Sequence, residues 1–118
     1  WAYSSGVTDD YLYNIYGKNI TKLIGATGDV VSYTCPAATE SIIKNINLYN
    51  SHSGTIVIYP KITDSSASVT ATLDKISLGT LANTSLAGPF ILETGDTLIF
   101  NCDTASKIYV FASVLELS

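Results

Sequence analysis

The amino-acid sequence predicts an all-β domain: an antiparallel β-sandwich of jelly-roll type, with about eight strands and an extended N-terminal arm. Three observations predict this fold class. Apolar runs of about five to nine residues recur along the chain, each closed by Gly, Pro, Asn, Asp or Ser, as in short strands joined by turns. Thr, Ser, Ile, Val and Tyr dominate, and these residues suit a pleated, half-buried surface. No segment carries an apolar stripe of helical period over three turns.

The chain length sets the domain organisation. With 118 residues, 47% of them hydrophobic, the chain can build one core but not two. We expect an arm over 1–18 and a sandwich domain over 19–118. A helix, if present, is short and lies around Asp9–Tyr16. The expected strands lie at 19–24, 29–35, 41–49, 54–62, 67–73, 89–93, 97–102 and 107–117.

Alternation within three of these strands predicts which side chains face the core. In 67–73, Val69, Ala71 and Leu73 are expected on one face and Ser68, Thr70 and Thr72 on the other, as in a sheet with one solvent-exposed side. In 107–117 the expected core-facing residues are Ile108, Val110, Ala112 and Val114. The residues between them are also apolar, so this strand is expected to be covered on both faces, by the fold or by a partner. They are Tyr109, Phe111, Leu115 and Leu117. In 41–49, the same period groups Ile42 with Ile46 and Leu48, and it puts Ile43 on the opposite face.

The first residues of the chain are rich in aromatic side chains. They hold half of the eight tyrosines, beside the single tryptophan. The residues concerned are Trp1, Tyr3, Tyr11, Tyr13 and Tyr16. Because Tyr and Trp are enriched in the cores of protein interfaces, this pattern predicts an arm that docks on another subunit. The alternative is an arm that folds back over its own sandwich.

Two segments repeat one pattern of turn, strand, aromatic residue and cysteine. Residues 27–35 read TGDVVSYTC, and residues 94–102 read TGDTLIFNC. Two strands that begin from the same Gly-Asp turn explain the repeat without a duplication. Cys35 and Cys102 form a disulfide if the ends of these strands lie side by side. Assembly in a cytoplasm favours the alternative, in which both thiols are reduced and buried.

The charge composition argues against two classes of partner. Only 14% of the residues are charged, the net charge is -4, and the six basic residues are all lysines, none of them adjacent. Arginine supplies the bidentate contact to phosphates and bases, so its absence disfavours nucleic-acid recognition. A negative net charge also disfavours anionic membrane surfaces, and no run approaches the ~20 apolar residues that cross a bilayer. We therefore expect neither nucleic acid nor membrane as a partner.

Few residues of the chain suit catalysis or metal binding. His52 is the single histidine and lies in NSHSG, which has the composition of a hairpin turn, with no G-x-S-x-G motif to accompany it. His52, Cys35 and Cys102 would give only three zinc ligands, without the close spacing of a zinc site. The carboxylates are scattered, and no calcium loop or phosphate-binding motif occurs. We therefore expect no enzymatic activity, no metal and no cofactor.

Several segments resemble small structural proteins of tailed bacteriophages. Residues 32–51, SYTCPAATESIIKNINLYNS, are similar to a strand, a T-x-P-A turn and an I-I-K-x-I-x-[LV]-x-N strand of that family. Further similar segments are 54–59, 92–98 and 108–117. Cys35 departs from the pattern, which has an apolar residue such as Val there. The resemblance covers about 21–117, leaves the arm unmatched, and includes no catalytic signature.

The resemblance implies a structural component of a virion. The expected function is that of a capsid decoration, or cement, protein that binds the major capsid protein or another virion protein. It also implies a homo-oligomer, with a trimer favoured, that is assembled in the host cytoplasm. Residues Tyr109, Phe111, Leu115 and Leu117 are the expected oligomer interface.

An alternative function is a neck, tail or fibre subunit that binds a carbohydrate or a receptor. Sugar sites stack rings on exposed aromatic side chains flanked by Asn or Asp. The run Tyr49-Asn50-Ser51-His52, together with Tyr59, has the residue types of such a platform.

Overall fold

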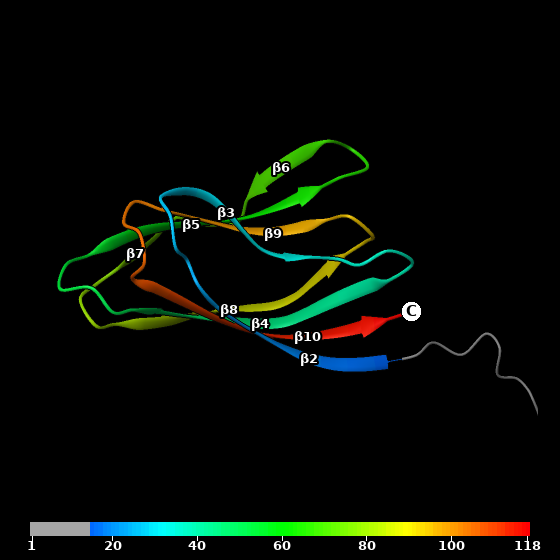
Figure 1. The fold of residues 1–118 in the computed structure, drawn as a ribbon, viewed down its shortest axis with the longest axis horizontal. Helices are drawn as coiled ribbons and strands as arrows, with labels where there is room; N and C mark the ends of the chain where they lie inside the picture. Colours follow the sequence, from blue (N-terminus) through cyan, green and yellow to red (C-terminus); the bar gives the residue numbers. More distant parts are fainter. Residues whose placement is uncertain (1–14) are drawn as a thin grey trace, which may run out of the picture.

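The structure, a computed structural model, describes residues 15–118 and consists of two antiparallel β-sheets packed face to face (Figure 1). Within this range there are nine strands and no helix. They are β2 (Ile15–Leu23), β3 (Gly28–Thr34), β4 (Glu40–Asn50), β5 (Ile56–Asp64), β6 (Val69–Thr72), β7 (Ile76–Leu78), β8 (Asn83–Leu92), β9 (Thr97–Cys102) and β10 (Ile108–Leu117). The prediction of an all-β sandwich is confirmed.

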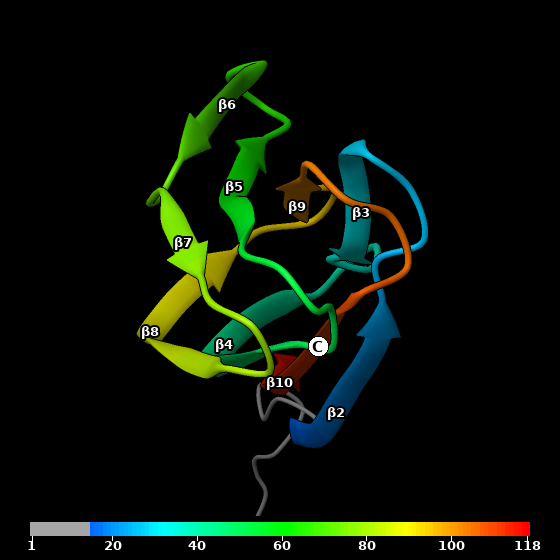
Figure 2. The same ribbon diagram turned by 90° about the vertical axis from the view of Figure 1, so that its left-hand side faces the viewer.

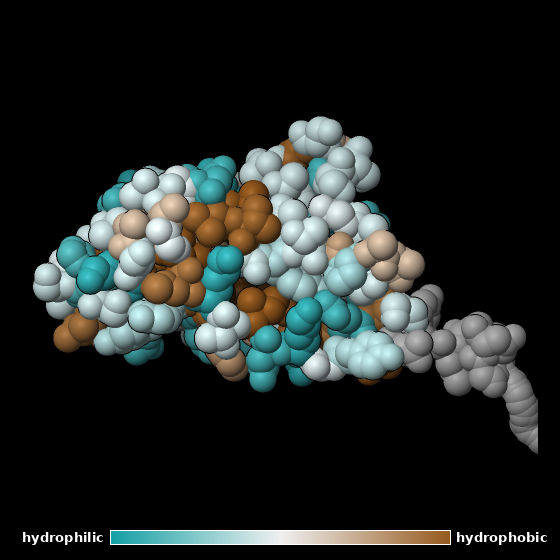
Figure 3. Space-filling model, viewed as in Figure 1, coloured by the Kyte–Doolittle hydropathy of each residue, from teal (hydrophilic) through white to brown (hydrophobic). Residues whose placement is uncertain are grey.

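The strand order places β10 inside one of the two sheets. Sheet I has four strands in the order β2-β10-β4-β8. Sheet II has five strands, with the order β3-β9-β5-β6 and with β7 paired to an earlier part of β5, on the same edge as β6. Seen end-on, β2 and β3 lie at the same edge of the sandwich (Figure 2). Figure 3 views the molecule from that edge, and apolar side chains are visible between the two layers.

The expected strands are present, with differences at three places. β7 was not expected, because a strand of three residues gives almost no period to read. β8 begins at Asn83, six residues before the expected start, because its first half is polar and pairs with β4 at an edge of sheet I. β2 begins at Ile15, so residues 15–18, expected in the arm, belong to a strand. Of the expected helix at Asp9–Tyr16, Ile15 and Tyr16 lie in β2, and the rest lies outside the described residues.

The core lies between the sheets and includes the inner face of β10. Ile108, Val110, Ala112 and Val114 are each at most 1% exposed, which confirms the predicted core-facing set. They pack with side chains of sheet II, the largest of which is Phe100 in β9, also fully buried. Burial of such side chains contributes about 1.5–3 kcal/mol each and is the main source of the fold's stability.

A β-bulge in β4 changes which of its residues face the core. Ile43 pairs with Val114 of β10, and Asn45 pairs with Ser113, so Lys44 is the extra residue. One extra residue moves the following side chains to the other face. Ile43 is therefore buried together with Ile46, whereas the sequence period placed them on opposite faces. That assignment was wrong because a bulge has no marker in the hydrophobic pattern.

The strand β6 also differs from expectation. Val69 and Ala71 were expected on the buried face of a strand that has one solvent-exposed side, but all four residues of β6 are exposed. β6 pairs only with the last residues of β5 and lies farther from sheet I than the other strands of sheet II do (Figures 1 and 2).

A buried polar group joins the two sheets at one end of the sandwich. The Tyr33 hydroxyl, on β3 of sheet II, donates to the Glu116 carboxylate of β10 and lies 2.7 Å from the Ser41 hydroxyl of β4. Burial, and then the hydrogen bond to Glu116, raise the pKa of Tyr33 well above its ordinary value, so the phenol stays protonated. Lys18 adds a 3.8 Å ion pair to Glu116. These contacts fix the register of the sheets where the apolar core ends.

At the other end of the sandwich, the buried polar residue that links separate segments is Asn50. Its side chain is fully buried, and its Nδ2 donates to the carbonyl oxygens of Gly54, Leu78 and Gly79 at 2.9–3.0 Å. Its Oδ1 accepts from the backbone N–H of His52 at 2.8 Å. Asn50 thereby holds the β4–β5 turn against the segment between β7 and β8.

The two Gly-Asp turns of the repeated pattern are built alike. Gly28 and Gly95 both have a positive φ, 80° and 87°, a conformation that costs glycine little. The strands that follow them, β3 and β9, pair with each other antiparallel, and Gly28 lies opposite Cys102. Antiparallel pairing brings the start of one strand beside the end of the other. Cys35 and Cys102 are therefore at opposite ends of the pair, and both are free, buried thiols.

Gly88 of β8 lies against the bulge of β4. A Cβ added there would lie 2.7 Å from the Lys44 carbonyl oxygen and closer still to that of Ile43. Both are backbone atoms of a central strand and cannot move aside easily. We predict that Gly88→Ala lowers the free energy of unfolding by about 2 kcal/mol or more, measured by urea denaturation.

Gly17→Ala in β2 is the matched control for this prediction. Nothing lies within 4 Å of a Cβ added at Gly17, so this variant should change stability by less than about 0.5 kcal/mol. Equal losses in the two variants would contradict the explanation.

Asp96, the aspartate of the second Gly-Asp turn, connects that turn to the β5–β6 loop by hydrogen bonds. Its Oδ1 accepts from the backbone N–H and the hydroxyl of Ser65, at 3.0 and 3.2 Å, and its Oδ2 accepts from the N–H of Glu93 at 2.9 Å. Burial opposes ionisation, but these hydrogen bonds outweigh it and hold the pKa of Asp96 below its ordinary value. The ionised form is therefore the one that stabilises the fold.

The lowered pKa of Asp96 predicts a loss of stability in acid. A carboxyl whose folded pKa is below its unfolded value of about 3.9 stabilises the fold above that pH, and the contribution disappears as the pH falls through the folded pKa. Asp96→Asn should lower stability by about 1–3 kcal/mol at pH 7 and weaken the dependence on pH below about 4. Denaturation curves between pH 7 and pH 2 measure both effects, with the exposed Asp74→Asn as control. An unchanged pH profile in Asp96→Asn would contradict this role.

Candidate interaction surface

The most distinctive surface is the side of sheet I that faces away from sheet II. We call it the outer face and define it by the side chains that alternate with the buried ones along the four strands. They are Ile15, Gly17, Asn19, Thr21 and Leu23 of β2; Tyr109, Phe111, Ser113, Leu115 and Leu117 of β10; Glu40, Ile42, Asn45, Asn47 and Tyr49 of β4; and Asn83, Ser85, Ala87 and Ile91 of β8.

Large apolar side chains form one end of the outer face. Leu23, Tyr109 and Tyr49 lie opposite one another across β2, β10 and β4, and Phe111 lies in the next row between Thr21 and Asn47. The exposed fractions are 46% for Tyr109, 41% for Phe111 and 39% for Tyr49. These side chains border a shallow groove of about 320 Å³. Aromatic residues are left partly in water here, an arrangement typical of a protein interface.

Aliphatic side chains form the other end of the outer face. Ile42 of β4 lies between Leu115 of β10 and Ile91 of β8, and Ile91 is 61% exposed. Asn19, Ser113 and Asn45 lie in the row between the two ends. The outer face is therefore apolar at both ends and polar but uncharged in the middle.

The outer face contains one charged side chain, Glu40, which lies opposite Leu117 in the last row of its aliphatic end. The other charged residues of the four strands are Lys18, Lys22 and Glu116, which lie opposite inward-facing positions, and Lys44, which is the bulge residue. Depletion of charge together with enrichment of Tyr and Phe is the composition of an interface core.

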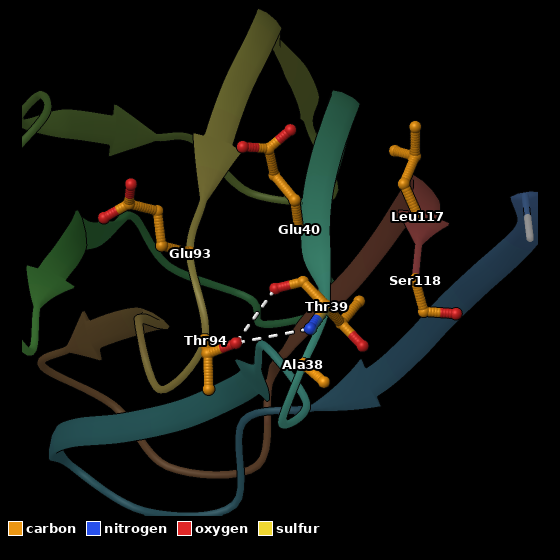
Figure 4. Close-up of a pocket in the computed structure, with 7 residues that line it drawn as sticks. All are labelled: Ala38, Thr39, Glu40, Glu93, Thr94, Leu117 and Ser118. Atoms are coloured by element: carbon orange, nitrogen blue, oxygen red, sulfur yellow. Dashed lines mark hydrogen bonds between the residues drawn. The ribbon is translucent and has the colours of Figure 1, made fainter. Parts of the chain in front are cut away.

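A second hollow lies at the end of the sandwich where β10 finishes, and its volume is about 500 Å³ (Figure 4). Thr39 and Thr94 face each other across it: the Thr94 hydroxyl donates to the Thr39 carbonyl oxygen at 3.1 Å and accepts from the Thr39 N–H at 3.3 Å. Glu40 and Glu93 also line it, both exposed to water. Neither carboxylate bonds with another residue drawn in Figure 4. This hollow has the properties of a solvated surface between two loops.

The structure separates the residues of the expected sugar platform. Asn50 is buried and its side-chain donors and acceptor are all used within the fold. Tyr49 points out of sheet I, whereas Tyr59, next to the buried Ile58, points out of sheet II. The two tyrosines therefore lie on opposite sides of the sandwich and cannot stack on one sugar chain.

Both thiols, Cys35 and Cys102, are buried in the core. Burial, and then the nearby Asp103 carboxylate, raise the pKa of Cys102 to about 11, which keeps the thiol protonated. Cys35 lies 3.2 Å from the Thr39 carbonyl oxygen, to which its thiol donates. Among residues 15–118, no three His, Cys, Asp or Glu side chains gather where they could hold a metal ion. The same part of the chain contains no helix of the length and hydrophobicity that crossing a bilayer requires.

The structure places all four residues of the expected oligomer interface on the outer face: Tyr109, Phe111, Leu115 and Leu117. Of the expected arm residues, Tyr16 lies in β2, opposite Glu116, and is 57% exposed. The other four, Trp1, Tyr3, Tyr11 and Tyr13, lie outside the described residues.

Sequence reasoning missed the residues that other strands contribute to the outer face. Leu23, Tyr49, Ile42 and Ile91 belong to three different strands, and only the strand order brings them beside β10. The alternation of apolar residues in β10 predicted only the residues that β10 itself contributes to this face.

Comparisons with known proteins match the fold but no family. No family model matches the chain, and no curated protein sequence is similar to it. One similar solved structure is a protein of Bacillus endospore appendages, described as disulfide-linked pili: TM-score 0.56, 12% identity, with 94% of each chain covered. At this identity the similarity shows the β-sandwich fold alone.

Two further structures come from virus particles. One is from a VLP of the extra small virus of the giant freshwater prawn Macrobrachium rosenbergii: TM-score 0.48, 17% identity, covering 98% of this chain and 87% of that one. The other is from the capsid asymmetric unit of cyanophage Pam1: TM-score 0.39, 13% identity, covering 98% and 93%. Both TM-scores are below 0.5, so no conclusion is based on them.

Proposed function

We propose that the chain is a non-enzymatic structural subunit of a phage virion, namely a capsid decoration protein that associates with itself and binds the shell. The observation that carries this proposal is the outer face of sheet I, where Tyr109, Phe111 and Tyr49 are 39–46% exposed in rows that hold no charged side chain. Exposed aromatic side chains on a rigid sheet would favour aggregation unless a partner covers them.

Three further points support a structural role. The fold is similar to that of a pilus protein, which is itself an assembly component. The sequence resemblance to small virion proteins covers most of the sandwich. The described residues make no reactive thiol, and His52 lies in a turn whose backbone Asn50 fixes.

Assembly of this chain is proposed to be non-covalent, unlike that of the disulfide-linked pili. Cys35 and Cys102 are 2% and 1% exposed, and each is enclosed by the core. A thiol in this position cannot reach a cysteine of another subunit without opening the sandwich. Contacts between subunits therefore rest on the outer face and on the arm, and a closed homo-oligomer, with a trimer favoured by the family resemblance, is part of this proposal.

The arm is the proposed contact with the shell. Its sequence, from Trp1 to Asn14 before β2, holds a tryptophan and three tyrosines, and Tyr16 continues the series into β2. Aromatic residues at a chain end can insert into grooves of a partner, as anchors of an interface do.

The first prediction of this proposal is that the chain is present in purified particles of its source phage. Particles are purified on a density gradient, and the chain is quantified by peptide mass spectrometry against the major capsid protein. A fixed ratio to the capsid protein, retained after a wash in high salt, is expected. Its absence from the particles would overturn the proposal.

The second prediction concerns the arm. Because β2 begins at Ile15, deletion of residues 1–14 leaves every described strand intact. The deletion variant should keep its far-UV circular dichroism and melting temperature within a few degrees, yet bind shells lacking the chain at least about tenfold more weakly, a loss typical of aromatic anchors. The full-length chain is the control in the same co-sedimentation assay. Unchanged binding by a folded deletion variant would remove the arm from the proposed contact.

A further inference from the structure

We infer that the outer face of sheet I pairs with the same face of a second copy of this chain, around a two-fold axis. The inference deepens the proposed function and rests on its assignment of the outer face to contacts between subunits. It names the partner of that face and the symmetry of the contact. The argument uses the charge, the area and the side-chain pattern of the face.

The charge distribution favours a second copy over a charged partner. The chain carries a net charge of -4, so two copies repel each other through most of their surfaces. Identical surfaces that meet around a two-fold axis associate well only where they carry few charges or their charges are self-complementary. The outer face carries no charge in the rows of Leu23, Thr21 and Asn19, and its one carboxylate, Glu40, lies in the last row, opposite Leu117.

The area of the face is sufficient for a stable pair. Four strands about 4.8 Å apart and nine residues long, at about 3.3 Å per residue, cover about 600 Å². Two such faces would bury about 1,200 Å² in total, which is the lower limit of stable, specific interfaces. A pair built on this face alone should therefore be of modest affinity and depend on concentration.

The side-chain pattern is self-complementary. The groove of about 320 Å³ is bordered by Tyr49, Tyr109 and Phe111, while Asn47 and Asn83 supply amide donors and acceptors at its rim. An amide both donates and accepts hydrogen bonds, so two identical rows of Asn can satisfy each other. Aromatic side chains of one copy can pack against those of the other in offset or edge-to-face contacts.

Two-fold pairing also bears on the oligomer number. A contact in which both copies use the same patch closes with two copies. A trimer could use this contact only between trimers, which gives six copies. The inference therefore predicts an even number of subunits.

The test is the mass of the full-length chain in solution, by light scattering after size exclusion at a series of concentrations, together with one pair of variants. Phe111→Glu puts a charge at the groove, and Val31→Glu is the control. Val31 is 47% exposed, on β3 of sheet II, against 41% for Phe111 on β10. The wild type and Val31→Glu should form dimers or hexamers, and Phe111→Glu should associate at least about tenfold more weakly. Circular dichroism checks the folding of each variant, and Phe111→Ser replaces Phe111→Glu if the latter does not fold.

Three results would overturn the inference. The first is a wild type that remains a monomer at all concentrations, and the second is an assembly that Phe111→Glu and Phe111→Ser leave unchanged. The third is a monomer that becomes a dimer only when residues 1–14 are deleted, which would assign the outer face to the chain's own arm. A dimer in solution together with absence of the chain from particles would support the pairing and reject the virion function, so the two failures can be told apart.

Discussion

The packing of β10 against the opposite sheet is the constraint on which the rest of the structure depends. β10 lies between β2 and β4, and its inner side chains from Ile108 to Val114 are completely buried. Side chains of a strand alternate between two faces, so burying this set fixes Tyr109 and Phe111 on the outside. In most sandwiches the outward positions are polar, whereas here they are aromatic or aliphatic. The same alternation therefore places one set of β10 side chains in the core and the other set in the candidate interface. A change in the register of β10 would move both sets together.

Polar residues fix the parts that hydrophobic packing alone would leave free to slide. Tyr33 joins the sheets at one end through Ser41 and Glu116, and Asn50 closes the other end with its side-chain hydrogen bonds. Asp96 ties the turn before β9 to the β5–β6 loop. Each of these groups is buried and satisfied, which is the condition under which buried polar groups add specificity without a large desolvation cost. A rigid scaffold of this kind presents its outer face in one fixed shape, so two copies can associate with little loss of conformational entropy.

The proposed role follows from what the surface is built to contact. The exposed carboxylates of the hollow around Thr39 and Thr94 lie in open solvent, and the two cysteines are enclosed in the core. The outer face, by contrast, combines a rigid sheet, few charges and exposed aromatic area, which are properties of surfaces that bind proteins. A subunit of a particle needs such a surface for its neighbours and a separate segment for the shell. In the proposed role, the outer face contacts neighbouring subunits and the segment before β2 contacts the shell.

The sequence by itself determined the fold class, the position of most strands and the double-sided apolar character of β10, because strand period and turn residues are local properties. From the sequence, Cys35 and Cys102 could be either disulfide-bonded or reduced. The tertiary structure decided for two free thiols, because antiparallel pairing of β3 with β9 puts the cysteines at opposite ends of the strand pair. The bulge at Lys44 was likewise invisible, because one extra residue changes the pairing partner and not the composition. The gathering of Leu23, Tyr49 and Ile91 beside β10 depends on strand order, which is set by contacts between residues far apart in the chain. Local chemistry therefore predicted the strands, and only the long-range packing decided which of their faces became one surface.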